Sequence, residues 1–240
     1  MPRRGRLIAI EGRSAAGKTT LVRAAASQLR WQPLAEAFDR LDPAPSLEFA
    51  SPRELLLLEG TLLAEEVRRY REAREMCVRG DTVLVDTGFF GPLLYTRGLV
   101  ELGRAPESAG RAVLRSTLSL LRRGALRMPD LTIYLETTAS ARVSHLRADT
   151  LHHPFGLARR HEAVGAVEQR FFEEAFPAVL PDRFRTLPSR PGPLGLVPTL
   201  KALVADAEPT PASRAEGIAL LSLFSLPVRE GRRPDGGPNR

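Results

Sequence analysis

The chain has 240 residues, of which 43% are hydrophobic and 26% charged, and its formal net charge is +7. Its length suffices for one α/β domain with a buried core; no apolar run could span a membrane, and neither the single Cys77 nor the N-terminus indicates secretion, so we expect a cytoplasmic protein. The arginines are spread along the chain and often stand beside glutamates, which favours a compositional bias over a nucleic-acid-binding patch.

The first predicted strand, Arg6 to Glu11, is followed by a glycine-rich loop and then by a helix to about Arg30. Residues 12–19 match the pattern G-x-x-x-x-G-K-[ST] at every specified position. The glycines let backbone N–H groups converge on an anion, Lys18 adds a point charge, and the Thr19 hydroxyl is a ligand for Mg²⁺. Lys18 is one of only two lysines in the chain, which argues against a chance match. The predicted ATP-binding residues are Gly12, Arg13, Ser14, Ala15, Ala16, Gly17, Lys18, Thr19 and Thr20.

A short second strand is predicted from Trp31 to Glu36, and the proline-containing residues 38–50 are predicted to form a loop. Glu36 follows the strand, where a carboxylate suits the deprotonation of an acceptor hydroxyl; a solvated loop glutamate is the alternative. Ser51-Pro52-Arg53-Glu54 has the pattern of a capped helix start. The helix is expected to run to about Val78, because apolar residues recur at helical spacing.

The apolar run Thr82 to Val85 predicts a buried strand that ends in Asp86. In an open α/β sheet the ligand lies beyond the carboxyl ends of the strands, so Asp86 and the loop should face the same crevice. Asp86 is therefore a candidate Mg²⁺ ligand together with Thr19, and a helix-capping aspartate is the alternative. Further helices are predicted over 90–102 and 106–123.

The second half continues the alternation of strands and helices. Strands are predicted over 131–136 and 183–187, and helices over 139–147, 160–180 and 194–205. Alternating strands and helices predict a parallel sheet with helices on both faces. The fold class is therefore α/β.

Residues 148–157 are irregular, and a lid is predicted at about 148–162, within a longer stretch from Arg142 to Arg170 that contains several arginines and all four histidines. The four histidines do not have the spacing of a known metal site. A lid with arginines would suit phosphoryl transfer, in which negative charge spreads over the phosphoryl oxygens. The candidate lid residues are Arg159 and Arg160.

Residues 1–207 are expected to form one domain, and residues 208–240 a C-terminal extension. Within the extension, Ser213 and Glu216 form a candidate capping box before the apolar run Ile218 to Leu226. This run predicts a helix that docks on the domain or on a second copy of the chain, as in a homodimer. A mostly disordered tail is the alternative.

Residues 6–207 resemble the thymidylate kinase and deoxynucleoside kinase group of P-loop kinases. The resemblance lies in Ile10-Glu11-Gly12 with the rest of the loop, in residues 79–86 and 129–136, and in Arg160-His161-Glu162. It implies the three-layer P-loop NTPase fold, a five-stranded sheet in the order 2-3-1-4-5, and ATP on the glycine loop. It also implies an acceptor site below the ends of the second and third strands.

The chain departs from this group on the acceptor side. The arginine that follows the third-strand aspartate in the family is Thr87 here, so a charged contact to an acceptor phosphate is missing. Arg68 or Arg69 on the long helix, or Arg97, could replace it. Arg68 and Arg97 are candidate acceptor-binding residues beside Glu36.

Taken together, the sequence predicts ATP- and Mg²⁺-dependent phosphoryl transfer to a small molecule, with a nucleoside or nucleotide as the preferred acceptor. One alternative is a kinase for a non-nucleotide alcohol, such as a secondary metabolite. Another is a nucleotide-binding regulatory protein without kinase activity, and a nucleic-acid-dependent ATPase is a third.

Overall fold

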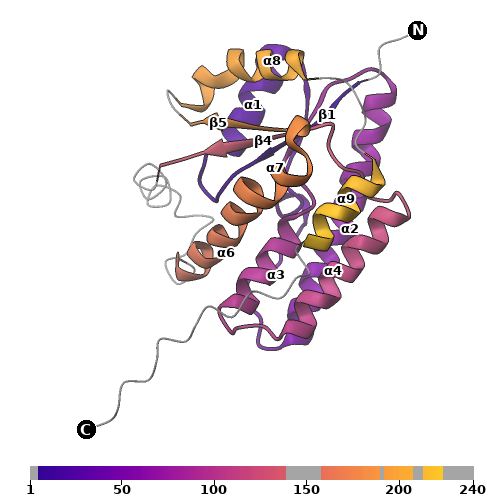
Figure 1. Ribbon diagram of the computed structural model, residues 1–240, viewed down its shortest axis with the longest axis vertical. Coiled ribbons are helices and arrows are strands. Elements are labelled where there is room, and N and C mark those ends of the chain that lie inside the picture. Colours follow the sequence, from indigo (N-terminus) through magenta and orange to yellow (C-terminus); the bar gives the residue numbers. More distant parts are fainter. Residues whose placement is uncertain (1–4, 139–157, 190–191, 208–212, 224–240) are drawn as a thin grey trace.

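The computed structural model describes residues 5–138, 158–189, 192–207 and 213–223, with only the backbone of 158–163. Its strands form one parallel five-stranded sheet in the order β2-β3-β1-β4-β5, with helices on both faces (Figure 1). This confirms the predicted P-loop fold and strand order. The strands are β1 (Leu7–Glu11), β2 (Gln32–Leu34), β3 (Val83–Asp86), β4 (Leu131–Glu136) and β5 (Phe184–Pro188).

The helices follow the predicted order closely. They are α1 (Lys18–Leu29), α2 (Pro52–Val78), α3 (Gly91–Glu101), α4 (Glu107–Arg122), α6 (Ala158–Arg170), α7 (Phe176–Val179), α8 (Val197–Asp206) and α9 (Arg214–Leu223). Short 3₁₀ turns lie at η1 (Phe38–Arg40), η4 (Pro181–Arg183) and η5 (Pro193–Leu196).

The helix predicted over 160–180 is divided by a π-helical segment, η3 (Phe171–Ala175), between α6 and α7. Pro177, in the first turn of α7, has no N–H to donate to the carbonyl of Glu173, so the regular α-helical ladder cannot continue through this point. Phe171, Phe172 and Phe176 are nevertheless fully buried in the core.

The sheet separates two apolar layers. Ile8 and Ile10 of β1 pack with α1, η5 and α8 on one face, whereas Leu7 packs with α2, α3, α4 and the α6–α7 segment on the other. Figure 1 shows α1 and α8 together on the first of these faces. All five residues of β1 are buried, as expected for a central parallel strand.

The predicted start of α2 is confirmed in detail. The backbone N–H of Glu54 donates to Ser51 Oγ over 3.2 Å, and the Glu54 carboxylate accepts from the N–H of Ala50 over 2.8 Å. Pro52 occupies the first turn, where its missing N–H costs nothing. The cap fixes the direction in which this long helix leaves the preceding loop.

The helix predicted within the C-terminal extension is α9, and it docks on the domain. The Glu216 N–H donates to Ser213 Oγ over 3.2 Å, as in a capping box. Leu220 and Leu221 are fully buried in the larger core, against α4 and α7.

Several predicted features fall outside the described residues. They are the helix over 139–147, most of the lid at 148–162, and the part of the extension beyond 223. None of the helices in the described ranges is both long and apolar enough to cross a membrane.

Two helical glycines give a matched test of packing between α3 and α6. A Cβ atom on Gly98 would lie 2.7 Å from Val164 Cγ2, whereas a Cβ on Gly60 of α2 would meet nothing within 4 Å. We expect Gly98→Ala to lower the free energy of unfolding by about 1–3 kcal/mol because the two helices must separate. Gly60→Ala should raise it by about 0.5–1 kcal/mol through helix propensity. Chemical denaturation of both variants measures this; a stabilised Gly98→Ala would contradict the packing.

Candidate phosphoryl-transfer site

The loop between β1 and α1 has the closed geometry that its glycines were expected to permit. Gly12 and Gly17 adopt positive φ angles of 145° and 93°. A Cβ on Gly12 would lie 2.8 Å from the Leu135 carbonyl oxygen, and one on Gly17 would lie 2.8 Å from Pro193 Cγ. Both positions therefore exclude larger residues, and the loop is pressed between β4 and η5.

The helix that follows the loop leaves its positive end available to an anion. No acidic residue lies in the first turn of α1, and no side chain caps it. Lys18 begins this helix and folds back over the loop, where its Nζ donates to the Gly12 carbonyl over 2.8 Å. The ammonium group and the N-terminus of α1 therefore both lie at the loop between β1 and α1.

Lys18 lies among carboxylates. Burial alone would lower the pKa of its ammonium group, but neighbouring negative charge outweighs this effect and the pKa is raised. The carboxylates responsible, in decreasing order of effect, are Glu36, Glu168, Asp86 and Glu11. Acidic groups at the ends of β1 and β3, in the segment after β2 and on α6 therefore all lie near Lys18.

Asp86, at the end of β3, lies beside Thr19. Burial raises the pKa of Asp86, while the charge of Lys18 and a hydrogen bond with the Thr19 side chain lower it in part. The Asp86 side chain is 1% exposed, and its Oδ1 has no hydrogen-bond partner among the described residues. Helix α3 begins after Phe90 without a side-chain cap, so Asp86 does not cap it.

This arrangement fits a magnesium ion that a nucleotide brings with it. A buried carboxylate oxygen without a partner, next to a hydroxyl group, is the donor set that Mg²⁺ accepts alongside phosphate oxygens. In the described part of the chain, no three His, Cys, Asp or Glu side chains gather into a metal cage of their own. Thr19 and Asp86 are the residues that would hold the ion.

Glu36 and Thr87 meet at the neighbouring strand ends. The Thr87 hydroxyl donates to Glu36 Oε2 over 3.4 Å. Thr87 has a φ angle of 57°, which is strained for a β-branched residue. Its N–H donates to the Ile10 carbonyl over 3.0 Å, which helps to hold this conformation. Burial raises the pKa of Glu36, which Lys18 counteracts in part.

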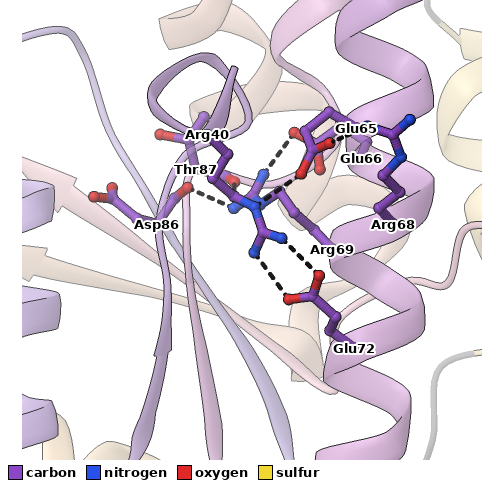
Figure 2. A network of polar contacts seen from close by, with 8 residues as sticks. All are labelled: Arg40, Glu65, Glu66, Arg68, Arg69, Glu72, Asp86 and Thr87. Carbon is purple, nitrogen blue, oxygen red and sulfur yellow. Dashed lines mark hydrogen bonds and ion pairs between the residues drawn. The ribbon is translucent and has the colours of Figure 1, made fainter. Parts of the chain in front are cut away.

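Arg69 of α2 lies beside the end of β3, next to Asp86 and Thr87 (Figure 2). Its side chain is fully buried and donates to Glu66 Oε1 over 2.6 Å and to the carbonyl oxygens of Asp86 and Thr87 over 2.9 and 3.0 Å. The guanidinium group therefore ties α2 to the end of β3 at the strained residue.

Another carboxyl group, that of Glu11, is buried at the end of β1. It is 3% exposed, and its Oε1 accepts the Gly88 N–H over 2.8 Å. Burial raises the pKa of Glu11 to about 8, although the Gly88 hydrogen bond and Lys18 oppose the shift. Glu11 is thus mostly protonated at neutral pH.

Some predicted site residues lie elsewhere or outside the described side chains. Arg68 is exposed and pairs with Glu65 over 3.0 Å. Arg97 pairs with Glu101 and Glu107, each over 3.5 Å. Arg159 and Arg160 fall in the first turn of α6, but their side chains are not among those described.

Further residues of the predicted ATP-binding set lie in the loop and in the first turn of α1. Ala16 is buried and its N–H donates to the Arg13 carbonyl over 3.0 Å, whereas Thr20 is exposed on α1. The Arg13 side chain lies against α6, where a Cβ on Gly165 would come within 2.7 Å of Arg13 Nε.

The sequence analysis missed Glu11, Glu66 and Glu168 as neighbours of the site, and it considered Arg69 only as one of three arginines that could replace the missing one. For two of them a signal existed: Glu66 and Arg69 stand on the buried face of α2, in the same helical register as the core residues Tyr70 and Ala73. Charged residues on an otherwise apolar helix face indicate either an internal ion pair or a functional site.

Comparison with solved structures agrees with the fold. Deoxyadenosine kinase from M. mycoides with bound dATP superposes with a TM-score of 0.64 at 13% sequence identity, covering 83% of this chain and 100% of that one. Another structure of that enzyme, with dCMP and dCDP, gives a TM-score of 0.62 at 12% identity, covering 82% and 98%. Thymidylate kinase from Candida albicans gives 0.59 at 14% identity, covering 84% and 92%.

No protein-family model and no curated protein sequence matches the chain. The structural likeness therefore shows the fold: the chain has the P-loop kinase fold and resembles the group that contains deoxynucleoside and thymidylate kinases.

The buried Glu11 predicts an unusual pH dependence of stability. Between pH 4.5 and about 8 the unfolded chain has an ionised Glu11, whereas the folded chain keeps it protonated. Folding then takes up a proton, so stability falls as the pH rises through this window. In wild type, the free energy of unfolding should therefore fall with pH by up to about 1.4 kcal/mol per pH unit on account of Glu11. We expect Glu11→Gln to lack this contribution. Urea denaturation at several pH values measures this, and parallel curves for the two proteins would contradict it.

Proposed function

We propose that the chain is an ATP- and Mg²⁺-dependent kinase of a small molecule, with a nucleoside or nucleoside-like alcohol as the acceptor. The observation that carries this proposal is the convergence of Lys18, Asp86 and Glu36 at one edge of the sheet, beside a glycine loop and an uncapped helix N-terminus. The likeness to nucleoside and nucleotide kinases supports the same class of reaction.

Each group has a role in this proposal. The loop and Lys18 bind the phosphates of ATP, and Lys18 neutralises charge on the phosphoryl group as it transfers. Thr19 and Asp86 hold Mg²⁺, which supplies further charge neutralisation when bound. Arg159 or Arg160 would close over the phosphates, as the resemblance to the family implies.

Glu36 acts as the base for the acceptor. Its raised pKa makes the carboxylate a better proton acceptor than a solvated glutamate. The acceptor O–H bond breaks as the proton moves to Glu36, and the acceptor oxygen forms a bond to the γ-phosphorus. The bond between that phosphorus and the β-phosphate oxygen breaks, and ADP leaves.

A hydroxyl acceptor fits the site better than a monophosphate. The acceptor side presents the carboxylates of Glu36, Glu66 and Asp39, and the charges of Asp86 and Asp39 both act on Glu36. Arg68 and Arg97, which could have met an acceptor phosphate, are paired with other carboxylates. A dianionic phosphate would be repelled here, whereas a neutral alcohol would not.

The two lysines of the chain allow a controlled test of the phosphate loop. Lys18→Ala should lower the rate of ATP turnover by about a hundredfold or more, because the positive charge that neutralises the transferring phosphoryl group is lost. Lys201→Ala, on the exposed face of α8, removes the same charge and should change the rate little. Melting temperatures of both variants should stay near wild type. Equal turnover in the two variants would remove the basis of the proposal.

The acceptor preference is testable by competition. Thymidine, other nucleosides and dTMP are offered at equal concentration with γ-labelled ATP and Mg²⁺, and the labelled products are separated. We expect nucleosides to be labelled in preference to dTMP because, among the described residues, the cations that act on Glu36 are Lys18 and Arg69, and Arg69 is paired with Glu66. Efficient dTMP labelling with nucleosides ignored would contradict this. Labelling of another alcohol from a cell extract alone would favour a non-nucleotide acceptor.

A further inference from the structure

We infer that Glu66 is a specificity-determining residue: by pairing with Arg69 it cancels the buried arginine behind the acceptor site and so disfavours phosphorylated acceptors. The inference rests on the proposed function, and it assigns the charge preference to one ion pair.

Arg69 is placed where an arginine could serve an acceptor phosphate. It donates to the carbonyl oxygens of Asp86 and Thr87, at the strand end where the resembling kinases carry their phosphate-binding arginine (Figure 2). Its charge acts on both Glu36 and Asp86. Arg69 is therefore close enough to influence a ligand beside Glu36, although its own side chain is fully buried.

Glu66 offsets the charge of Arg69. Its Oε1 accepts from Arg69 over 2.6 Å inside the protein, where the surroundings screen little. Its Oε2 has no hydrogen-bond partner among the described residues, and the charge of Glu66 acts on Glu11 as well. Burial raises the pKa of Glu66 to about 7, although the charge of Arg69 opposes this shift, and the pair is neutral overall when Glu66 is ionised.

The other arginines in Figure 2 do not replace Arg69. Arg40 donates to Glu65 over 2.8 Å and to Glu72 over 2.6 and 2.9 Å. Arg68 donates to Glu65 and is exposed. With Arg69 paired to Glu66, an acceptor phosphate meets mainly carboxylates and is repelled. Repulsion of this kind is a common means of rejecting a charged competitor.

The test is a gain of function. Glu66→Gln keeps the shape and a hydrogen-bond acceptor for Arg69 but removes the negative charge. We expect the ratio of dTMP to thymidine, in binding affinity and in kcat/KM, to rise about tenfold, because the full charge of Arg69 then acts at short range on the acceptor phosphate. Glu72→Gln is the control: it removes the same charge from the same helix, while Arg40 keeps its bond to Glu65. Its ratio should match wild type. An unchanged ratio in Glu66→Gln would overturn the inference.

A second variant keeps the inference testable if Glu66→Gln does not fold. Glu66→Met combined with Arg69→Met replaces the buried pair by apolar groups, which proteins often tolerate. Because the pair is neutral, the dTMP-to-thymidine ratio should stay within about twofold of wild type. A selective loss of dTMP binding would show that Arg69 already serves the phosphate, and would overturn the inference.

Calorimetric binding of thymidine and dTMP separates this inference from the proposed function. Binding with the predicted change of ratio, but without turnover in wild type, would overturn the proposed kinase activity and support the role of Glu66. Turnover in wild type, with the same dTMP-to-thymidine ratio in Glu66→Gln as in wild type, would support the kinase activity and overturn the role of Glu66. Failure of wild type to bind either compound would overturn both.

Discussion

A single ammonium group, that of Lys18, lies among several carboxylates at the carboxyl edge of the sheet. The rest of the site depends on how this excess of negative charge is neutralised. The fold itself creates it, because parallel strands β1 and β3 end side by side, with Ile10 opposite Asp86. Burial reduces the imbalance by keeping Glu11 mostly protonated near neutral pH. In the proposed function, the divalent cation that accompanies ATP would neutralise part of the remaining negative charge.

Helix α2 organises the acceptor side of the site. Arg69 anchors it to the end of β3, and Arg40, from the turn after β2, is bound to Glu65 and Glu72 on the same helix. The two strand ends that carry Glu36 and Asp86 are thus fastened to one rigid element. The strained backbone of Thr87 is held at the junction, a position where strain is commonly associated with function.

Much of the donor half could be predicted from the sequence because its requirements are local. The spacing of Gly12, Gly17 and Lys18 encodes the loop, and the Ser51 cap encodes the start of α2. Strand order followed from the resemblance to known kinases. The acceptor half could not be predicted in the same way, because the pairing of Arg69 with Glu66 and with the carbonyls at positions 86 and 87 depends on how α2 packs on the sheet. A break in the helix after Arg170 was likewise missed, although Pro177 was a visible signal.

The proposed function depends on Asp86 and Thr19 as the residues that would hold Mg²⁺ at the phosphate loop. The most direct measurement is calorimetric affinity for ATP, with and without Mg²⁺, in wild type and in Asp86→Asn, which keeps the size of the side chain. The account predicts that Mg²⁺ strengthens ATP binding to wild type and that this gain largely disappears in Asp86→Asn, while metal-free ATP binds at least as well as before. An undiminished gain from Mg²⁺ in Asp86→Asn would contradict it.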